Sequence, residues 1–158
     1  MKNLFLCFTL FCFTAFLLSC GKDNDTNDTD KDIRPVSDTP YIELIDVQPT
    51  NVKAFEDSIV FTIYYLDGNG DIGTSDADVN SLFLKDSRGA FEIGYHIPPL
   101  SPKNSSITIE GHFKITLQNT ILFGDGESAE KAVFEIYLVD KAGLKSNVLH
   151  SPEITVNP

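Results

Sequence analysis

An acidic loop near the middle of the chain offers oxygen ligands for a hard cation. Side chains with carboxylate or amide oxygens stand at alternate positions, with glycines between them that let the backbone curl: Asp67, Asn69 and Asp71. Calcium takes six to eight oxygens at about 2.3–2.6 Å, and this spacing can direct several side chains to one centre. Asp76 and Asp78 follow closely and can complete the shell. We therefore predict a calcium site formed by these five residues.

The loop differs from an EF-hand, because Ile72 stands where the sixth-position glycine belongs and no helical pattern flanks it. An ion-free turn is the alternative, with Asp and Asn side chains accepting hydrogen bonds from their own backbone. That alternative explains the glycines, but it explains the clustering of like charges less well. Both interpretations stay open, and in either the expected role is structural.

The sequence gives little support to catalysis. His96, His112 and His150 are too isolated for a zinc site, and no cysteine of the mature chain can join them. No Gly-x-Ser-x-Gly segment marks a serine nucleophile. We therefore expect a protein that is not an enzyme.

Cys20 is the residue with the clearest covalent chemistry. It follows Leu17-Leu18-Ser19 at the end of an apolar run that starts at Leu4, behind Lys2. The run has roughly fifteen residues, which suits a signal peptide and is short of the ~20 needed to span a bilayer. The arrangement resembles the signal peptide and lipobox of bacterial lipoproteins. This resemblance implies a signal peptide over residues 1–19 and a covalent lipid on Cys20, the new N-terminus.

Export and cysteine usage together limit how the core is held. Cys7 and Cys12 lie in the segment that is removed, so the mature chain has no disulfide. An exported domain of this kind must close its core by packing alone or with a bound metal.

A polar, acidic segment follows the lipidation site. Residues 21–32 contain no aromatic or aliphatic side chain and cannot offset the cost of ordering their backbone. We predict a flexible tether over residues 20–40. Its start, Lys22-Asp23-Asn24-Asp25, resembles the surface-export signals of Bacteroidota lipoproteins, which implies a place on the outer face of the outer membrane. A plain spacer, with the protein on the periplasmic face, is the alternative.

The formal net charge of −11 argues against two classes of partner. Loss of Lys2 with the signal peptide makes the mature chain one unit more negative. Such a chain repels anionic lipid headgroups and nucleic acid. We expect no nucleic-acid partner, and contact with the membrane through the lipid alone.

From residue 41 onward the hydrophobic pattern has a period of two. Apolar residues share one face of two segments, at Ile59, Phe61, Ile63 and Tyr65 and at Ala132, Phe134, Ile136 and Leu138. Turn sequences separate seven candidate strands, at 41–47, 58–66, 81–85, 90–97, 107–117, 131–139 and 148–156. This spacing predicts an all-β domain over residues 41–158, an antiparallel two-sheet sandwich of about seven strands.

Two segments resemble immunoglobulin-like domains of Bacteroidota lipoproteins. They are Phe61–Gly73 and the ending Phe134–Val148, which is closed by Pro152–Val156. The resemblance implies an immunoglobulin or fibronectin-III-like sandwich. Many such proteins have no assigned function, so it implies no activity.

Asp140 has two possible roles in such a fold. The loop after the second strand and the last hairpin lie at the same end of an immunoglobulin-like sandwich, so Asp140 can approach the acidic loop. An Asp before Lys-Ala-Gly also commonly caps its own turn. We leave it, and Asp125 between two glycines, outside the predicted site.

Together these observations predict a membrane-anchored, non-catalytic lipoprotein of the cell envelope. Its sandwich domain is expected to act as a binding or adhesion module for a glycan or a protein, with calcium as a stabilising ion. A structural or accessory subunit of a larger outer-membrane complex is the alternative. The absence of Trp weakens the glycan version.

Overall fold

The computed structural model describes residues 36–103 and 105–158, which belong to one compact unit. Every regular element in these residues is a strand, and they contain no helix that is long and apolar enough to cross a membrane. The predicted signal peptide, Cys20 and most of the tether lie outside the described residues and stay predictions.

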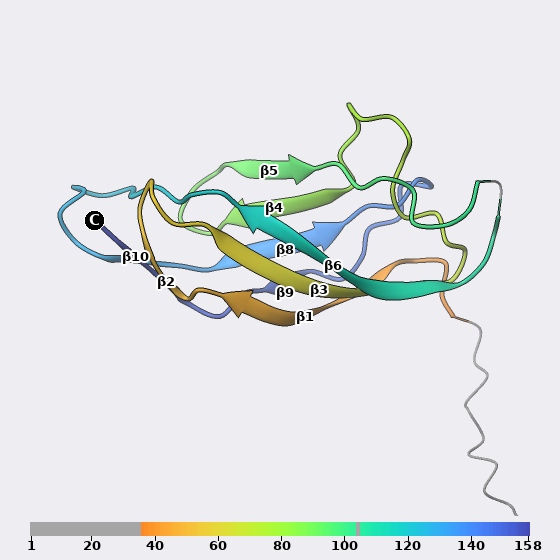
Figure 1. Ribbon diagram of the computed structural model, residues 1–158, viewed down its shortest axis with the longest axis horizontal. Helices are drawn as coiled ribbons and strands as arrows, with labels where there is room; N and C mark the ends of the chain where they lie inside the picture. Colours follow the sequence, from red (N-terminus) through yellow and green to blue (C-terminus); the bar gives the residue numbers. More distant parts are fainter. Residues whose placement is uncertain (1–35, 104) are drawn as a thin grey trace, which may run out of the picture. The chain divides into compact units, whose positions relative to one another are not determined.

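Ten strands form three hydrogen-bonded groups (Figure 1). One antiparallel sheet has the order β1–β3–β6, from β1 (Tyr41–Gln48), β3 (Ile59–Asp67) and β6 (Ile109–Leu117). A second antiparallel sheet has the order β5–β4–β8–β9, from β4 (Leu82–Asp86), β5 (Glu92–Tyr95), β8 (Phe134–Leu138) and β9 (Leu149–His150). In the third, β10 (Ile154–Asn157) lies between a parallel β2 (Asn51–Lys53) and an antiparallel β7 (Glu130–Ala132).

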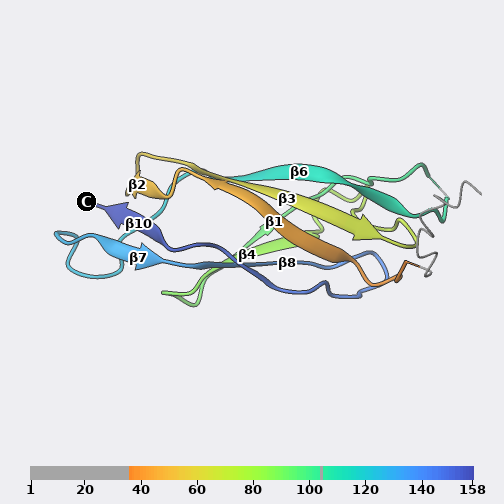
Figure 2. The ribbon, with the colours of Figure 1, turned by 90° about the horizontal axis from the view of Figure 1, so that it is seen from below.

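The predicted alternation builds the core. Alternate residues of β3 and β8 are buried, namely Ile59, Phe61, Ile63, Phe134, Ile136 and Leu138. The Phe61 and Phe134 rings meet edge to face, with centroids 5.6 Å apart, and this contact joins the two larger sheets. In the view of Figure 2, β6 and β8 lie on opposite sides of that core. The prediction of an all-β domain is confirmed. Its strand pairs are antiparallel except for β2–β10, and the arrangement is consistent with a sandwich.

The number of strands differs from the expected seven because two predicted segments are divided. The segment at 148–156 is broken between β9 and β10, where Pro152 has no amide hydrogen for a ladder. The segment at 131–139 is broken at Val133, where the chain changes its partners from β10 to β4 and β9. The sequence did not predict β2, whose three residues are too few to show a period.

The last residues of the predicted tether lie against the domain. The Gly68 amide donates to the Ser37 carbonyl at 2.9 Å, and Pro40 is buried before β1 begins at Tyr41. The chain is thus held to the acidic loop before its first strand.

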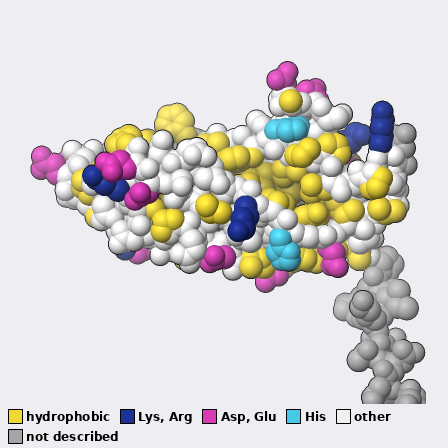
Figure 3. Space-filling view, viewed as in Figure 1, with side chains coloured by type: hydrophobic (Ala, Val, Ile, Leu, Met, Phe, Trp, Pro, Cys, Tyr) yellow, Lys and Arg dark blue, Asp and Glu magenta, His cyan; other side chains and the backbone are white. Residues whose placement is uncertain are grey.

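Apolar side chains also remain on the surface. On the face seen in Figure 3 they gather over the middle of the domain, and acidic side chains lie around the margins. The most exposed large apolar residue is Phe91, in the connection between β4 and β5. Its ring contrasts with the fully buried ring of Phe61.

This contrast gives a test of the core. We expect Phe61→Ala to lower the free energy of unfolding by about 3–5 kcal/mol, because it removes a buried ring and leaves a cavity. Phe91→Ala is the matched control, since Phe91 is 74% exposed, and should change stability by about 0.5 kcal/mol or less. Urea unfolding followed by circular dichroism measures both, and equal losses would contradict the assigned core.

Candidate metal centre

The acidic loop begins at the buried end of β3. Asp67 is the last residue of that strand and has no exposed surface. One of its oxygens, Oδ2, accepts a hydrogen bond from the Asp71 amide at 2.9 Å. Oδ1 of Asn69 accepts from the same amide at 3.2 Å. The loop therefore has the self-capped geometry of the ion-free alternative, but this uses only one of Asp67's two oxygens.

Two glycines hold the loop tightly against its neighbours. Gly70 (φ 71°) lies against the Ile107 carbonyl, and Gly73 (φ 83°) lies against the carbonyls of Ile97 and Pro98. A Cβ at either position would collide with these backbone atoms, and both φ values are unfavourable for other residues. The loop is thereby fixed between the start of β6 and the segment that follows β5.

Asp140 reaches this loop from the end of β8, in the other large sheet. Its Oδ1 accepts a hydrogen bond from the Leu144 amide at 2.7 Å, so it caps its own turn. The next residue, Lys141, donates its amide to the Asp71 carbonyl at 3.1 Å and joins the two turns. Asp140 thus has both of the roles that the sequence left open.

Folding brings three carboxylates together at this point. One oxygen from each of Asp67, Asp71 and Asp140 lies within 4.8 Å of the other two. Each residue also has a buried oxygen with no hydrogen-bond partner: Oδ1 of Asp67, Oδ1 of Asp71 and Oδ2 of Asp140. In the described part of the chain, Thr120 Oγ1 is the only other buried side-chain oxygen in this state. A buried polar group without a partner costs about 1–3 kcal/mol, and more when it is charged.

The surroundings disfavour the ionised form of two of these carboxylates, those of Asp67 and Asp71. Burial raises the pKa of Asp67 above its ordinary value of 3.8, and the charges of Asp71 and Asp140 raise it further. Burial and the charge of Asp140 also raise the pKa of Asp71, although Lys141 opposes this. A cation between the carboxylates would favour their charged forms and so oppose both effects.

The chemistry of the group suits calcium. Oxygens that share one calcium ion lie within about 5 Å of each other, twice the Ca–O distance, and the observed spacing meets this limit. The three donors are carboxylates, which are hard ligands, and the group includes no sulfur or imidazole. Asp67, Asp71 and Asp140 can therefore hold the ion, with water or loop carbonyls as further ligands.

The structure brings only two of the five predicted ligands into this group of three carboxylates. Asp67 and Asp71 belong to the group of three. Asn69 lies in the same loop, but its oxygen accepts the Asp71 amide. Asp76 and Asp78 are exposed and outside the group, and Oδ1 of Asp76 accepts a hydrogen bond from the Asp78 amide at 3.1 Å.

Comparison of this chain with family models, with curated proteins and with solved structures found no match. The resemblance to Bacteroidota lipoprotein domains therefore stays a prediction.

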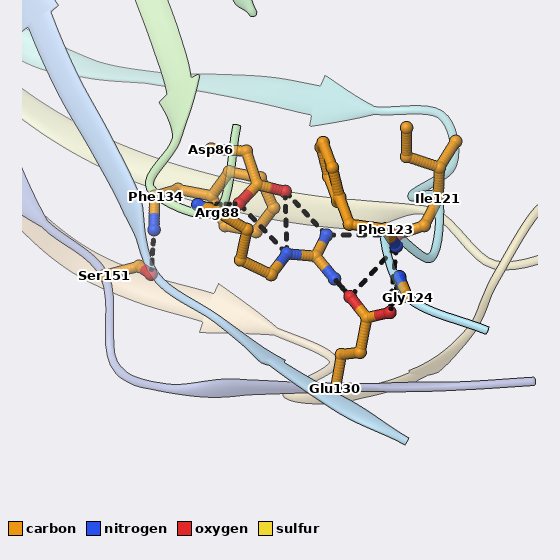
Figure 4. Close-up of polar contacts among 8 residues, drawn as sticks. All are labelled: Asp86, Arg88, Ile121, Phe123, Gly124, Glu130, Phe134 and Ser151. Atoms are coloured by element: carbon orange, nitrogen blue, oxygen red, sulfur yellow. Dashed lines mark hydrogen bonds and ion pairs between the residues drawn. The ribbon is translucent and has the colours of Figure 1, made fainter. Parts of the chain in front are cut away.

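A second cluster of charges, around Arg88, is fully paired (Figure 4). The Arg88 guanidinium donates to both oxygens of Asp86 and to Oε2 of Glu130 at 2.6–3.2 Å. Glu130 also accepts the amides of Phe123 and Gly124. Burial alone would lower the pKa of Arg88, but the hydrogen bonds and charges of the two carboxylates outweigh it and raise this pKa. This cluster needs no added ion and fixes the connection between β6 and β7.

The repulsion among the three aspartates predicts an unusual stabilising mutation. Because their folded-state pKa values are raised, Asp67 and Asp71 destabilise the metal-free domain as pH rises from about 3.8 through those values. Asp140→Asn keeps the Oδ1 cap and offers an amide to its neighbours. Without divalent cations at neutral pH it should stabilise the domain by about 1–2 kcal/mol, and should flatten this pH dependence.

Thermal melts in EDTA, from mildly acidic to neutral pH, measure this effect. Asp125→Asn is the control, because the exposed Asp125 caps a similar turn through the amides of Glu127 and Ser128. The control should change stability by about 0.5 kcal/mol or less. Destabilisation of the metal-free protein by Asp140→Asn would contradict a repulsive cluster.

Proposed function

We propose that this chain is a non-catalytic, lipid-anchored protein of the cell envelope, whose sandwich domain is a calcium-stabilised binding or adhesion module. The observation that carries the proposal is the set of three buried carboxylate oxygens without partners, on Asp67, Asp71 and Asp140. Buried polar groups are normally paired, and exceptions point to a strained site or to a binding site for an ion or ligand. Like-charged groups this close require a counter-charge, and a divalent cation supplies it.

The ion's role would be to join the two large sheets at one end of the domain. Asp67 ends β3 and Asp140 follows β8, so one calcium ion bound to both would tie those strand ends together. A ligand that binds only the folded state stabilises it by mass action. This suits an exported domain that has no disulfide in its mature form.

The anchor and the location rest on the N-terminal sequence. We propose lipidation at Cys20, placement at the outer membrane, and exposure at the cell surface through the acidic start of the tether. The Val36–Pro40 segment, whose Ser37 carbonyl accepts the Gly68 amide, would place the acidic loop beside the point where the tether leaves the domain. The loop would then lie at the membrane-proximal end.

We also propose an immunoglobulin-like topology and no enzymatic activity. The topology is supported by two sheets with the orders β1–β3–β6 and β5–β4–β8–β9. The histidines have other contacts: His96 Nδ1 lies 3.0 Å from the Val79 carbonyl oxygen, and His112 packs against the Tyr64 ring. His150 lies 3.9 Å from Glu135, so no histidine accompanies the three aspartates.

An accessory subunit remains the second candidate, and an apolar cleft favours it. The cleft measures about 220 Å³, and four exposed apolar residues line it, Phe91, Ile93, Ile121 and Phe123. Its one charged lining residue, Asp86, is already neutralised by Arg88. This cleft points to no particular partner, so the calcium-stabilised module is the function that the geometry supports best.

Calcium binding is tested on the mature chain, residues 20–158, with Cys20→Ser in place of the lipidated residue. Extracellular calcium modules bind with a Kd of about 10⁻⁴–10⁻³ M. At ten to a hundred times Kd, the ion should stabilise the fold by about 1.4–2.7 kcal/mol and raise Tm by roughly 5–10 °C. The gain should shrink in mild acid, where protons compete for Asp67 and Asp71.

Differential scanning calorimetry in calcium and in EDTA gives the readout. Asp125→Asn should keep the whole shift and Asp140→Asn should lose most of it. A wild-type Tm that does not change even at about 100 mM calcium, a hundred times the weakest expected Kd, would refute the site.

Lipidation is tested separately in an expressing bacterium. The wild-type chain should incorporate labelled palmitate and partition into detergent, whereas Cys20→Ser should do neither and should accumulate with its signal peptide attached. Palmitate labelling of the Cys20→Ser chain would show that the lipid is elsewhere.

A further inference from the structure

A cleft of about 340 Å³ opens beside the candidate metal centre. The acidic loop forms one wall, from Gly70 to Ser75, and includes the proposed ligand Asp71. The segment after β5 and Lys141 from the turn after β8 form the rest of the lining. The cleft is thus built from the segments that the proposed ion would join.

Two lysines that border the cleft form no ion pair with the described residues. Most other cations of the described residues have a partner: Lys53 pairs with Glu56, Lys85 with Glu135, Arg88 with Asp86 and Glu130, and Lys131 with Glu153, while Lys145 lies over the Tyr137 ring. Lys103 and Lys141 form no such pair in the described part, yet both border this one cleft. In so acidic a chain, two unpaired lysines at one cleft favour an anionic ligand.

Calcium would reverse the charge of this region. The three aspartates contribute −3 and the two lysines +2, which gives −1 without an ion. One bound Ca²⁺ changes the sum to +1. An anion would therefore be repelled from the ion-free cleft and attracted to the ion-bound one.

The remaining lining suits a sugar ring. Hydroxyl groups and proline rings border the cleft, from Thr74, Ser75, Ser101, Ser105, Pro99 and Pro102. Hydroxyls both donate and accept hydrogen bonds, which matches a polyhydroxylated ligand. The proline rings offer an apolar face for the C–H groups of such a ring. An acidic peptide could use the lysines and some of the hydroxyls, but a sugar offers a hydroxyl group on most carbons of its ring and so matches this lining more closely.

We propose that the cleft binds an acidic sugar, a hexuronate, when calcium occupies the Asp67–Asp71–Asp140 site. The sugar carboxylate would pair with Lys103 and Lys141, and its hydroxyls would bond to the serine and threonine side chains. This inference rests on the proposed calcium site and names the ligand class of the binding module. Because the coupling is reciprocal, the sugar would also tighten calcium binding by the same factor.

Isothermal titration calorimetry on the mature Cys20→Ser chain tests the proposal, with glucuronate as the probe and glucose as its neutral counterpart. Glucuronate should bind at least about fivefold more tightly in calcium than in EDTA, a typical allosteric coupling. Glucose should bind in neither buffer. Lys141→Gln should weaken glucuronate binding without reducing the calcium-induced rise in Tm, whereas Lys114→Gln, a lysine outside the cleft, should change neither.

The outcomes separate this inference from the proposed function. A calcium shift in Tm, with glucuronate binding absent or equal in both buffers, overturns the acidic-sugar proposal and leaves the calcium module standing. No calcium shift overturns both. Calcium-dependent binding of an acetylated tri-aspartate peptide in place of glucuronate would assign the cleft to an acidic protein partner and refute the sugar.

Discussion

Repulsion among three carboxylates lowers the stability of the domain at the end where β3 and β8 finish. The hydrophobic core buries alternate residues from Ile59 to Ile63 and from Phe134 to Leu138, and this burial does not depend on the aspartates that follow. The strands nevertheless deliver Asp67 and Asp140 to the same place, where each has a buried oxygen without a partner. Desolvation raises the free energy of the charged form of such groups, and repulsion between like charges raises it further. Without a cation, packing in the core must therefore offset the cost of burying these carboxylates at this end of the domain.

The Arg88 cluster shows the alternative way of burying charge. Its guanidinium donates charge-assisted hydrogen bonds to Asp86 and Glu130. Glu130 also accepts hydrogen bonds from two backbone amides. Each charged group of this cluster forms hydrogen bonds with other groups of the same chain, so its pairing does not require a ligand. The balance of the Asp67 cluster depends on solution conditions instead. Every charged group of the Arg88 cluster has a partner within the chain, whereas the Asp67 cluster keeps three buried oxygens without one.

The sequence predicted the strands better than the site. Alternation at Ile59–Leu66 and Lys131–Val139 identifies local structure, because the period of a strand is visible within a few residues. The division at Pro152 and the short β2 depend on pairing between distant segments and leave weak local signals. Asp140 is more than sixty residues from Asp67 in sequence, so only the topology could bring it to the loop. Conversely, Asp76 and Asp78 are close in sequence, but their loop carries them to the surface.

A cation at this position would add a second link between β3 and β8, which belong to different sheets. In antibody domains a disulfide joins the sheets through the core. Here the edge-to-face contact between Phe61 and Phe134 joins β3 to β8 inside the core, and it needs no ion. Calcium on Asp67 and Asp140 would add a second link at the strand ends, next to the loops. The first link needs no ligand, whereas the second would tie the loops, and the cleft beside them, to the binding of calcium.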